Sequence, residues 1–224
     1  CMQVRLAAIE ALAPLAGPTH IQALLEEAES DTNPAAGAAV DLLWKIGAPE
    51  CFSLMKECLG RKKIREHWTA RKMVDCLAMY GAVESAGLIR GYLQDDNGAY
   101  RHAAPYALAR LNVRSAIPEI VASMKKYEKD LGYISECCKA LAHFGGRDAL
   151  TAHLASINDA PDEAQKAGRI WQFHNGLPDP AVEEAVLQLY KNTDKLPVVK
   201  PCASVLTTVG SKACIETMLD GLEK

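Results

Sequence analysis

Residues 100–112 read Tyr100-Arg101-His102-Ala103-Ala104-Pro105-Tyr106-Ala107-Leu108-Ala109-Arg110-Leu111-Asn112. In a helix of about 3.6 residues per turn, Ala104, Ala107, Leu108 and Leu111 fall at i, i+3, i+4 and i+7, and therefore share one apolar stripe. The two alanines allow a neighbouring helix to approach closely, while the two leucines fill the space between the helices. This stretch predicts an amphipathic helix that packs against other helices.

Weaker copies of the stripe recur along all 224 residues. In each copy a leucine or isoleucine is followed three positions later by an apolar residue and then by a stop, and the first members are Leu12, Leu43, Leu77, Leu108, Leu141, Ile170 and Leu206. They stand 29 to 36 residues apart. Such a period is typical of helical arrays, in which each unit buries its apolar face against its neighbours. We expect an all-α single domain over 1–224, with repeats at roughly 1–30, 33–60, 66–95, 98–128, 130–158, 161–192 and 196–224.

The run from Leu93 to Leu108 resembles a HEAT repeat of the short type that is also found in phycobilisome lyases. The family pattern is an acidic turn, a Val-Arg, an alanine pair and an Ala-Leu before glycine. Repeats one and four keep the arginine as Arg5 and Arg101, whereas the other repeats have Ala36, Ala70, Ile134, Glu163 and Val199 there. The resemblance implies a right-handed α-solenoid of about seven antiparallel helix pairs. It also implies that the second helices line a concave face, which is the usual binding surface in such proteins.

Composition and charge narrow the classes of protein to consider. The net charge of −3 argues against a global field for nucleic acid. No apolar run reaches the length of a membrane span, and residues 1–16 lack the layout of a signal peptide, so we expect a cytoplasmic protein without membrane contact. The eight cysteines are then reduced thiols, of which Cys76, Cys137 and Cys202 sit on apolar stripes. Because the sequence begins with Cys1 inside a repeat, we expect a piece of a longer protein.

No catalytic or metal-binding constellation stands out, and we expect neither a catalytic residue nor a cofactor. Deoxyhypusine hydroxylase is built on similar repeats and needs His-Glu pairs for iron, but the single adjacent pair here is the reversed Glu66-His67. A Cys-x-x-Cys zinc motif is absent from the sequence. Cys137 and Cys138 with His143 form a candidate thiol site. Neighbouring residues on a helix point about 100° apart, however, which favours ordinary packing.

A basic run precedes the third repeat and is the candidate anion contact: Arg61, Lys62, Lys63, Arg65 and Trp68. Glycosylases built from HEAT-like repeats bind DNA on a basic face, so a nucleic-acid binder is one alternative. Opposite charges nearby and the net charge of the chain argue against it. A second alternative is a bilin lyase-like or chaperone-like factor, with Arg169, Trp171, Phe173 and His174 as the walls of a tetrapyrrole pocket, although Phe173 also falls on the repeat stripe.

The favoured function is a non-catalytic scaffold or adaptor that binds a partner protein or peptide. The predicted second helices carry charges of both signs, which suit a protein surface better than a polyanion. Arginine and the large aromatic residues are the types most often found in interface hot spots. The candidate contact residues are Lys56, Arg90, Tyr92, Glu119, Lys126 and His153.

Overall fold

Every regular element in the described part of the chain is helical, as the 3.6-residue periodicity predicts. The computed structural model describes residues 2–30, 34–64 and 67–220. These residues form fourteen α-helices and four short 3-10 helices, and the α-helices are joined by short turns. None of the helices in this described part combines the length and hydropathy that a membrane crossing requires. The all-α expectation is confirmed.

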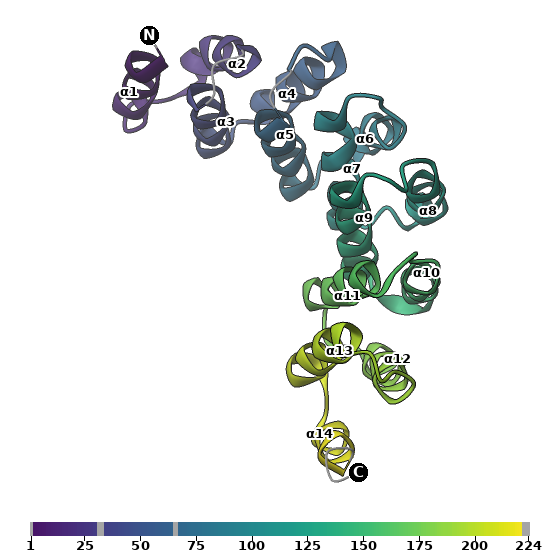
Figure 1. Ribbon diagram of the computed structural model, residues 1–224. Coiled ribbons are helices and arrows are strands. Elements are labelled where there is room, and N and C mark those ends of the chain that lie inside the picture. Colours follow the sequence, from purple (N-terminus) through teal and green to yellow (C-terminus); the bar gives the residue numbers. More distant parts are fainter. Residues whose placement is uncertain (1, 31–33, 65–66, 221–224) are drawn as a thin grey trace. The chain divides into compact units, whose positions relative to one another are not determined.

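The chain divides into two compact units, Cys1–Leu111 and Asn112–Lys224 (Figure 1). In unit 1 the described elements are α1 (Met2–Leu12), η1 (Pro18–His20), α2 (Ile21–Glu29), α3 (Ala35–Ile46), α4 (Pro49–Arg61), α5 (His67–Tyr80), η2 (Val83–Ser85), α6 (Ala86–Tyr92) and α7 (Gly98–Arg110). Here α1, α3, α5 and α7 pack against one another in chain order. Helices α2, α4 and α6 contact these odd-numbered helices from one side, and α2 also contacts α4.

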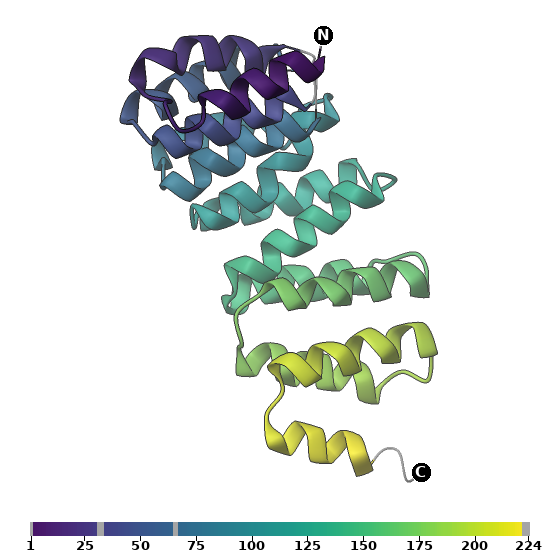
Figure 2. The same cartoon turned by 90° about the vertical axis from the view of Figure 1, so that its left-hand side faces the viewer.

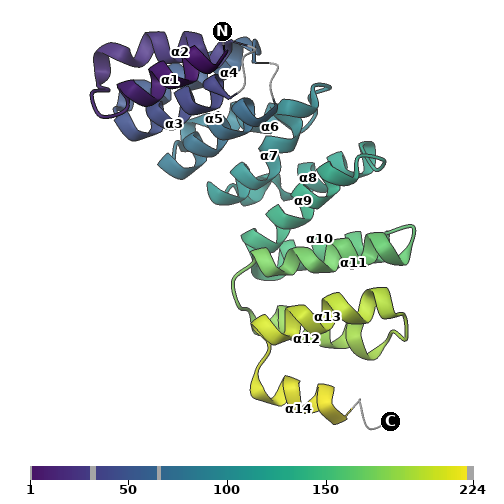
Figure 3. The same cartoon turned by 60° about the vertical axis from the view of Figure 1, so that its left-hand side comes forward.

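Unit 2 repeats this arrangement. Its elements are η3 (Arg114–Ala116), α8 (Ile117–Lys126), α9 (Leu131–Phe144), α10 (Gly146–Asn158), α11 (Glu163–Trp171), η4 (Gln172–Asn175), α12 (Pro180–Lys191), α13 (Leu196–Val209) and α14 (Lys212–Asp220). Helix α11 packs between α9 and α13, and α8 contacts α10. Figures 2 and 3 show successive helices of this unit side by side, for example α12 and α13.

Helix boundaries follow local capping chemistry. The Asn97 side chain accepts a hydrogen bond from the Ala99 amide at 3.0 Å and begins α7, and Asp162 does the same for the Gln165 amide of α11 at 2.8 Å. At the start of α14, Ser211 Oγ accepts a hydrogen bond from the Cys214 amide at 3.3 Å. Gly47 ends α3 with a φ of 62°, a left-handed conformation that glycine adopts without steric cost. The 3-10 turn Pro18–His20 directly precedes α2.

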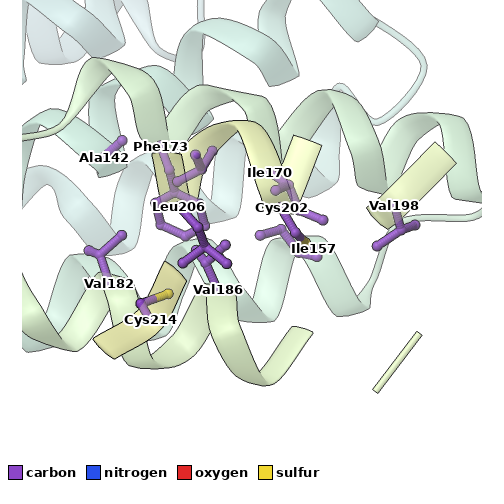
Figure 4. Packing of buried hydrophobic residues seen from close by; sticks show 11 residues of the cluster. Ala142, Ile157, Ile170, Phe173, Val182, Val186, Val198, Cys202, Leu206 and Cys214 are labelled. Carbon is purple, nitrogen blue, oxygen red and sulfur yellow. The ribbon is translucent and has the colours of Figure 1, made fainter. Parts of the chain in front are cut away.

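The repeat stripe lies in the core. Ala104, Ala107 and Leu108 are fully buried, and Leu111 is 9% exposed. In unit 2 the apolar residues of α9 to α14 form one cluster, in which Phe173, Val186 and Leu206 converge (Figure 4). Within each unit the apolar stripes therefore pack against neighbouring helices, as their spacing predicts.

Candidate functional site

Intramolecular ion pairs already occupy part of the predicted anion contact. Arg61 Nε donates a hydrogen bond to the Glu29 carboxylate at 3.0 Å, and Lys62 Nζ forms an ion pair with Asp95. Burial alone would raise the pKa of Glu29, but the hydrogen bond and the charge of Arg61 lower it overall. These carboxylates reduce the positive charge that the basic run can offer to a polyanion.

Two other members of the basic run lie at the surface of unit 1. Lys63 and Trp68 are exposed, and Trp68 as a whole residue is 60% exposed. Arg65 lies outside the described residues. The candidate anion contact in unit 1 thus rests on one exposed lysine and one exposed indole next to two neutralised cations.

Three predicted contact residues lie on the even-numbered helices of unit 1, and one of them is inaccessible. Lys56 of α4 is half-buried and donates a hydrogen bond to the Glu84 carbonyl at 3.1 Å. Arg90 of α6 is also half-buried. Tyr92 is only 1% exposed and packs against Tyr100, with 5.0 Å between the ring centroids. The proposal that Tyr92 contacts a partner is therefore wrong, because its ring fills the core between α6 and α7.

The other three predicted contact residues belong to unit 2. Glu119 of α8 is half-buried, and Lys126 is exposed with its ammonium 4.7 Å from the centroid of the Tyr127 ring. His153 of α10 is fully buried. The expectation of a His153 surface contact is wrong, because the imidazole stacks on Phe173, with 4.1 Å between the ring centroids.

The four residues predicted to line a tetrapyrrole pocket do not line a common cavity. Phe173 is 2% exposed and belongs to the core cluster. Trp171 is half-exposed, and its ring meets that of His174 edge-on at 5.0 Å. Within the described residues, Arg169 alone of the four lines the concavities of unit 2 that are described below.

The seven described cysteines are free thiols, and all of them are buried. The expected redox state of these thiols stays a prediction. Burial raises the pKa of Cys138 to about 11 and, together with the adjacent thiol, raises that of Cys137 well above its usual value. Because a thiolate is the reactive form, this pair is inert at neutral pH. No group of three or more His, Cys, Asp or Glu side chains converges within the described residues, and Glu66 lies outside them.

The most distinctive polar group in unit 2 is Arg169. Arg169 is 9% exposed, and its Nη1 donates a hydrogen bond to the Ser156 carbonyl in the last turn of α10. Nε is buried without a hydrogen-bond partner. In the described part of the chain, no carboxylate lies within ion-pair distance of this guanidinium, whose single side-chain hydrogen bond is the one to Ser156. Since arginine stays charged at any pH at which the protein folds, a buried and unpaired cation remains.

Three adjoining concavities meet at Arg169. The first lies among α8, α9 and α10, the second lies between α9 and α11, and the third lies at the turns that precede α9 and α11. The second has a volume of about 360 Å³ and is lined mostly by apolar surface. We call it the α9–α11 groove, and it is lined by Leu131, Ile134, Ser135, Asp162, Ala164, Gln165, Gly168, Arg169 and Gln172.

Local sequence explains how α11 forms one wall of this groove. Gln165, Arg169 and Gln172 fall at i, i+4 and i+7 and therefore share a face. Ala164 and Gly168 are small, exposed residues four positions apart, so they leave space beside α9. On the opposite wall, Leu131 opens α9 and is 55% exposed.

A hydrogen bond ties the two walls of the groove together. Gln172 Nε2 donates to Ser135 Oγ at 3.0 Å and so connects η4 to α9. The groove thus has one fixed contact between its walls, an exposed leucine and a buried guanidinium. A mostly apolar concavity with a few polar groups is the usual form of a binding site.

The sequence did not point to this groove. The sequence analysis assigns Arg169 to a tetrapyrrole pocket and places the predicted contacts on the second helix of each repeat. The groove instead lies between α9 and α11, which are the first helices of two predicted repeats. The available signal was a charged residue directly before the core residue Ile170, on a face shared with two glutamines.

Comparison with protein-family models and with curated proteins finds no match to this chain. The resemblance to HEAT repeats therefore stays a prediction from the period and from the residues of repeats one to four. The functional conclusion rests on the geometry of the groove.

Proposed function

We propose that this chain is a HEAT-like α-solenoid of about seven helix pairs that acts as a non-catalytic protein-interaction scaffold, and that the α9–α11 groove binds an extended segment of a partner protein. The alternation of odd- and even-numbered helices within each unit supports the repeat assignment. The observation that carries the function is the mostly apolar groove whose lining includes Arg169, a largely buried cation with no ion pair among the described residues.

Charge complementarity selects the occupant. A peptide segment with apolar residues and one acidic side chain would cover Leu131 and Ile134 and at the same time compensate Arg169. A polyanion is a poorer match, because the exposed acids Glu128 and Asp159 line the concavities next to the groove. Like charges at a contact disfavour the wrong partner.

The remaining chemistry fits a binding role. The described thiols are free and buried, which is compatible with the reducing cytoplasm. Burial holds the pKa of His153 at about 4, so this imidazole is neutral and enclosed at physiological pH. Among the described residues these were the strongest candidates for nucleophilic or acid-base chemistry, and both lie in the core.

Selection of peptides from a displayed random library, with the full chain as bait, tests this function. Selected peptides should bind the Leu131→Gln variant about tenfold more weakly, because the change removes apolar contact at the mouth of the groove. The matched control is Leu177→Gln, since Leu177 is 78% exposed and does not line the groove. Equal binding to both variants, or a library that yields no binder, would contradict the assignment.

A further inference from the structure

The guanidinium of Arg169 has one hydrogen-bonding edge in use and one unused. Nη1 donates to the Ser156 carbonyl, whereas Nε and Nη2 have no hydrogen-bond partner among the described residues. The N–H groups of Nε and Nη2 point to the same side of the planar group. They form one of the two forks that hold both oxygens of a carboxylate.

A purely structural role accounts for only part of this arrangement. Nη1 lies at the carbonyl end of α10, where the helix dipole favours a cation. This single bond leaves the Nε and Nη2 side of the guanidinium without a protein partner among the described residues. Arg114 of the same unit provides the contrast, because it donates to the Phe144 and Gly145 carbonyls at 2.8 Å each and its charge is paired with Asp148.

We propose that the Nε and Nη2 edge of Arg169 is a carboxylate receptor, which binds an aspartate or glutamate side chain of the segment that lies in the α9–α11 groove. This inference rests on the proposed peptide-binding function and names the group that the groove recognises. The guanidinium supplies the charge, and the mostly apolar lining of the groove strengthens its attraction to an opposite charge.

The surrounding charges favour a carboxylate over a phosphate. Lys125 and Lys129 are exposed cations at the rim, but Glu128, Asp159 and Asp162 line the same concavities. These three acids repel a dianion more strongly than a monoanion. Asp162 is also engaged, since its carboxylate accepts hydrogen bonds from the backbone and side-chain nitrogens of Gln165.

Nuclear magnetic resonance of the arginine side chains in the full ¹⁵N-labelled chain tests the receptor directly. The Nε–H signal of Arg169 should shift in a saturable manner on titration with sodium acetate, and sodium chloride at matched ionic strength should leave it in place. Arg114, whose charge is already paired with Asp148, is the internal control, and its Nε–H signal should respond to acetate less than that of Arg169. The Nε–H signals are assigned through their correlations with the carbons of the same side chain. The test therefore does not depend on an Arg169 variant that fails to fold.

Two further titrations decide between ligands. Inorganic phosphate should shift the Arg169 signal less than acetate at equal concentration, and a stronger response to phosphate would overturn the carboxylate assignment. Asp159→Asn removes one nearby acid and should strengthen the acetate response severalfold. An Arg169 signal that no anion shifts would show that this edge binds none.

Failure of the receptor and failure of the scaffold give different results. If selected peptides bind in the groove and lose affinity with Leu131→Gln, but acidic and amidated forms of the peptides bind equally, the scaffold stands and the carboxylate receptor is wrong. If acetate binds at Arg169 but the library yields no peptide, the receptor stands as a small-anion site and the proposed scaffold function fails.

Discussion

His153 Nε2 donates a hydrogen bond to the main-chain carbonyl of Arg169 at 2.9 Å, so the imidazole in the core of unit 2 and the unpaired guanidinium are parts of one arrangement. Because a carbonyl only accepts, Nε2 carries the proton. The ring is neutral, and its Nδ1 is buried without a hydrogen-bond partner. The bond ties α10 to α11 at the base of the α9–α11 groove.

The pKa of His153 predicts a loss of stability in acid. Burial is the main cause of its lowered pKa of about 4, the charge of Arg169 lowers it further, and the hydrogen bond opposes the shift. Between pH 6.5 and 4 the unfolded chain therefore binds a proton that the folded chain does not bind. The free energy of unfolding should fall by roughly 3 kcal/mol from this group as the pH decreases through that window.

Denaturant unfolding of wild type and His153→Gln at a series of pH values measures this effect. Glutamine can still donate to the Arg169 carbonyl but does not titrate, so the variant should lose less stability than wild type below pH 6.5, whatever its stability at neutral pH. Parallel curves for the two proteins would contradict the assignment.

Arg114 should be a larger contributor to stability than its partial exposure suggests. It bridges η3 to the corner between α9 and α10 through two backbone carbonyls and Asp148. Arg114→Met leaves these carbonyls without their charged donor and should lower the free energy of unfolding by about 1–3 kcal/mol. The matched control Arg147→Met, at an exposed arginine of the same corner, should change it by no more than about 0.5 kcal/mol. Urea unfolding distinguishes the two, and equal effects would argue against the bridge.

Phe173 should be the most sensitive apolar position tested in unit 2. It packs with Val186 and Leu206 in the core cluster and stacks on His153 (Figure 4). Phe173→Ala should reduce the free energy of unfolding by about 3–5 kcal/mol, because it leaves a cavity among helices from three pairs. Leu177→Ala, at an exposed leucine nearby in the chain, should cost at most about 0.5 kcal/mol. A small loss at Phe173 would mean that the core collapses to fill the space.

The described thiols should resist alkylation in the folded protein. Burial raises the pKa of Cys58 and of Cys76 to about 12, and that of Cys202 to about 11. Iodoacetamide at mildly alkaline pH should therefore modify them slowly in the native state and rapidly in guanidinium chloride. Mass spectrometry of peptides reports each site separately. Fast native labelling of Cys58 or Cys76 would indicate local opening of unit 1.

Helix type, and the residues that face the core, could be predicted because both depend on short-range order. The stripe through Ala104, Leu108 and Leu111 has the spacing of one helix face, and all three residues are buried. Caps such as Asn97 and Ser211 act over two or three residues, so local sequence can indicate them. The prediction of exposure was weaker, as Tyr92 and His153 show. A polar or aromatic residue at a helix edge is buried or exposed according to which helix covers it.

The amino-acid order thus sufficed for an all-helical chain with a period near that of helix pairs, because hydrogen bonds and apolar stripes within a helix are local. The burial of Arg169 and its lack of an ion pair among the described residues follow from packing between helices. Its guanidinium is buried because α10 and α9 pack around α11. It forms no ion pair because this packing brings the Ser156 carbonyl to it, and no carboxylate of the described residues lies within ion-pair distance. Ser156 lies 13 positions away in the chain. Contacts at such a separation follow from tertiary structure, which the periodicity of a single helix does not encode.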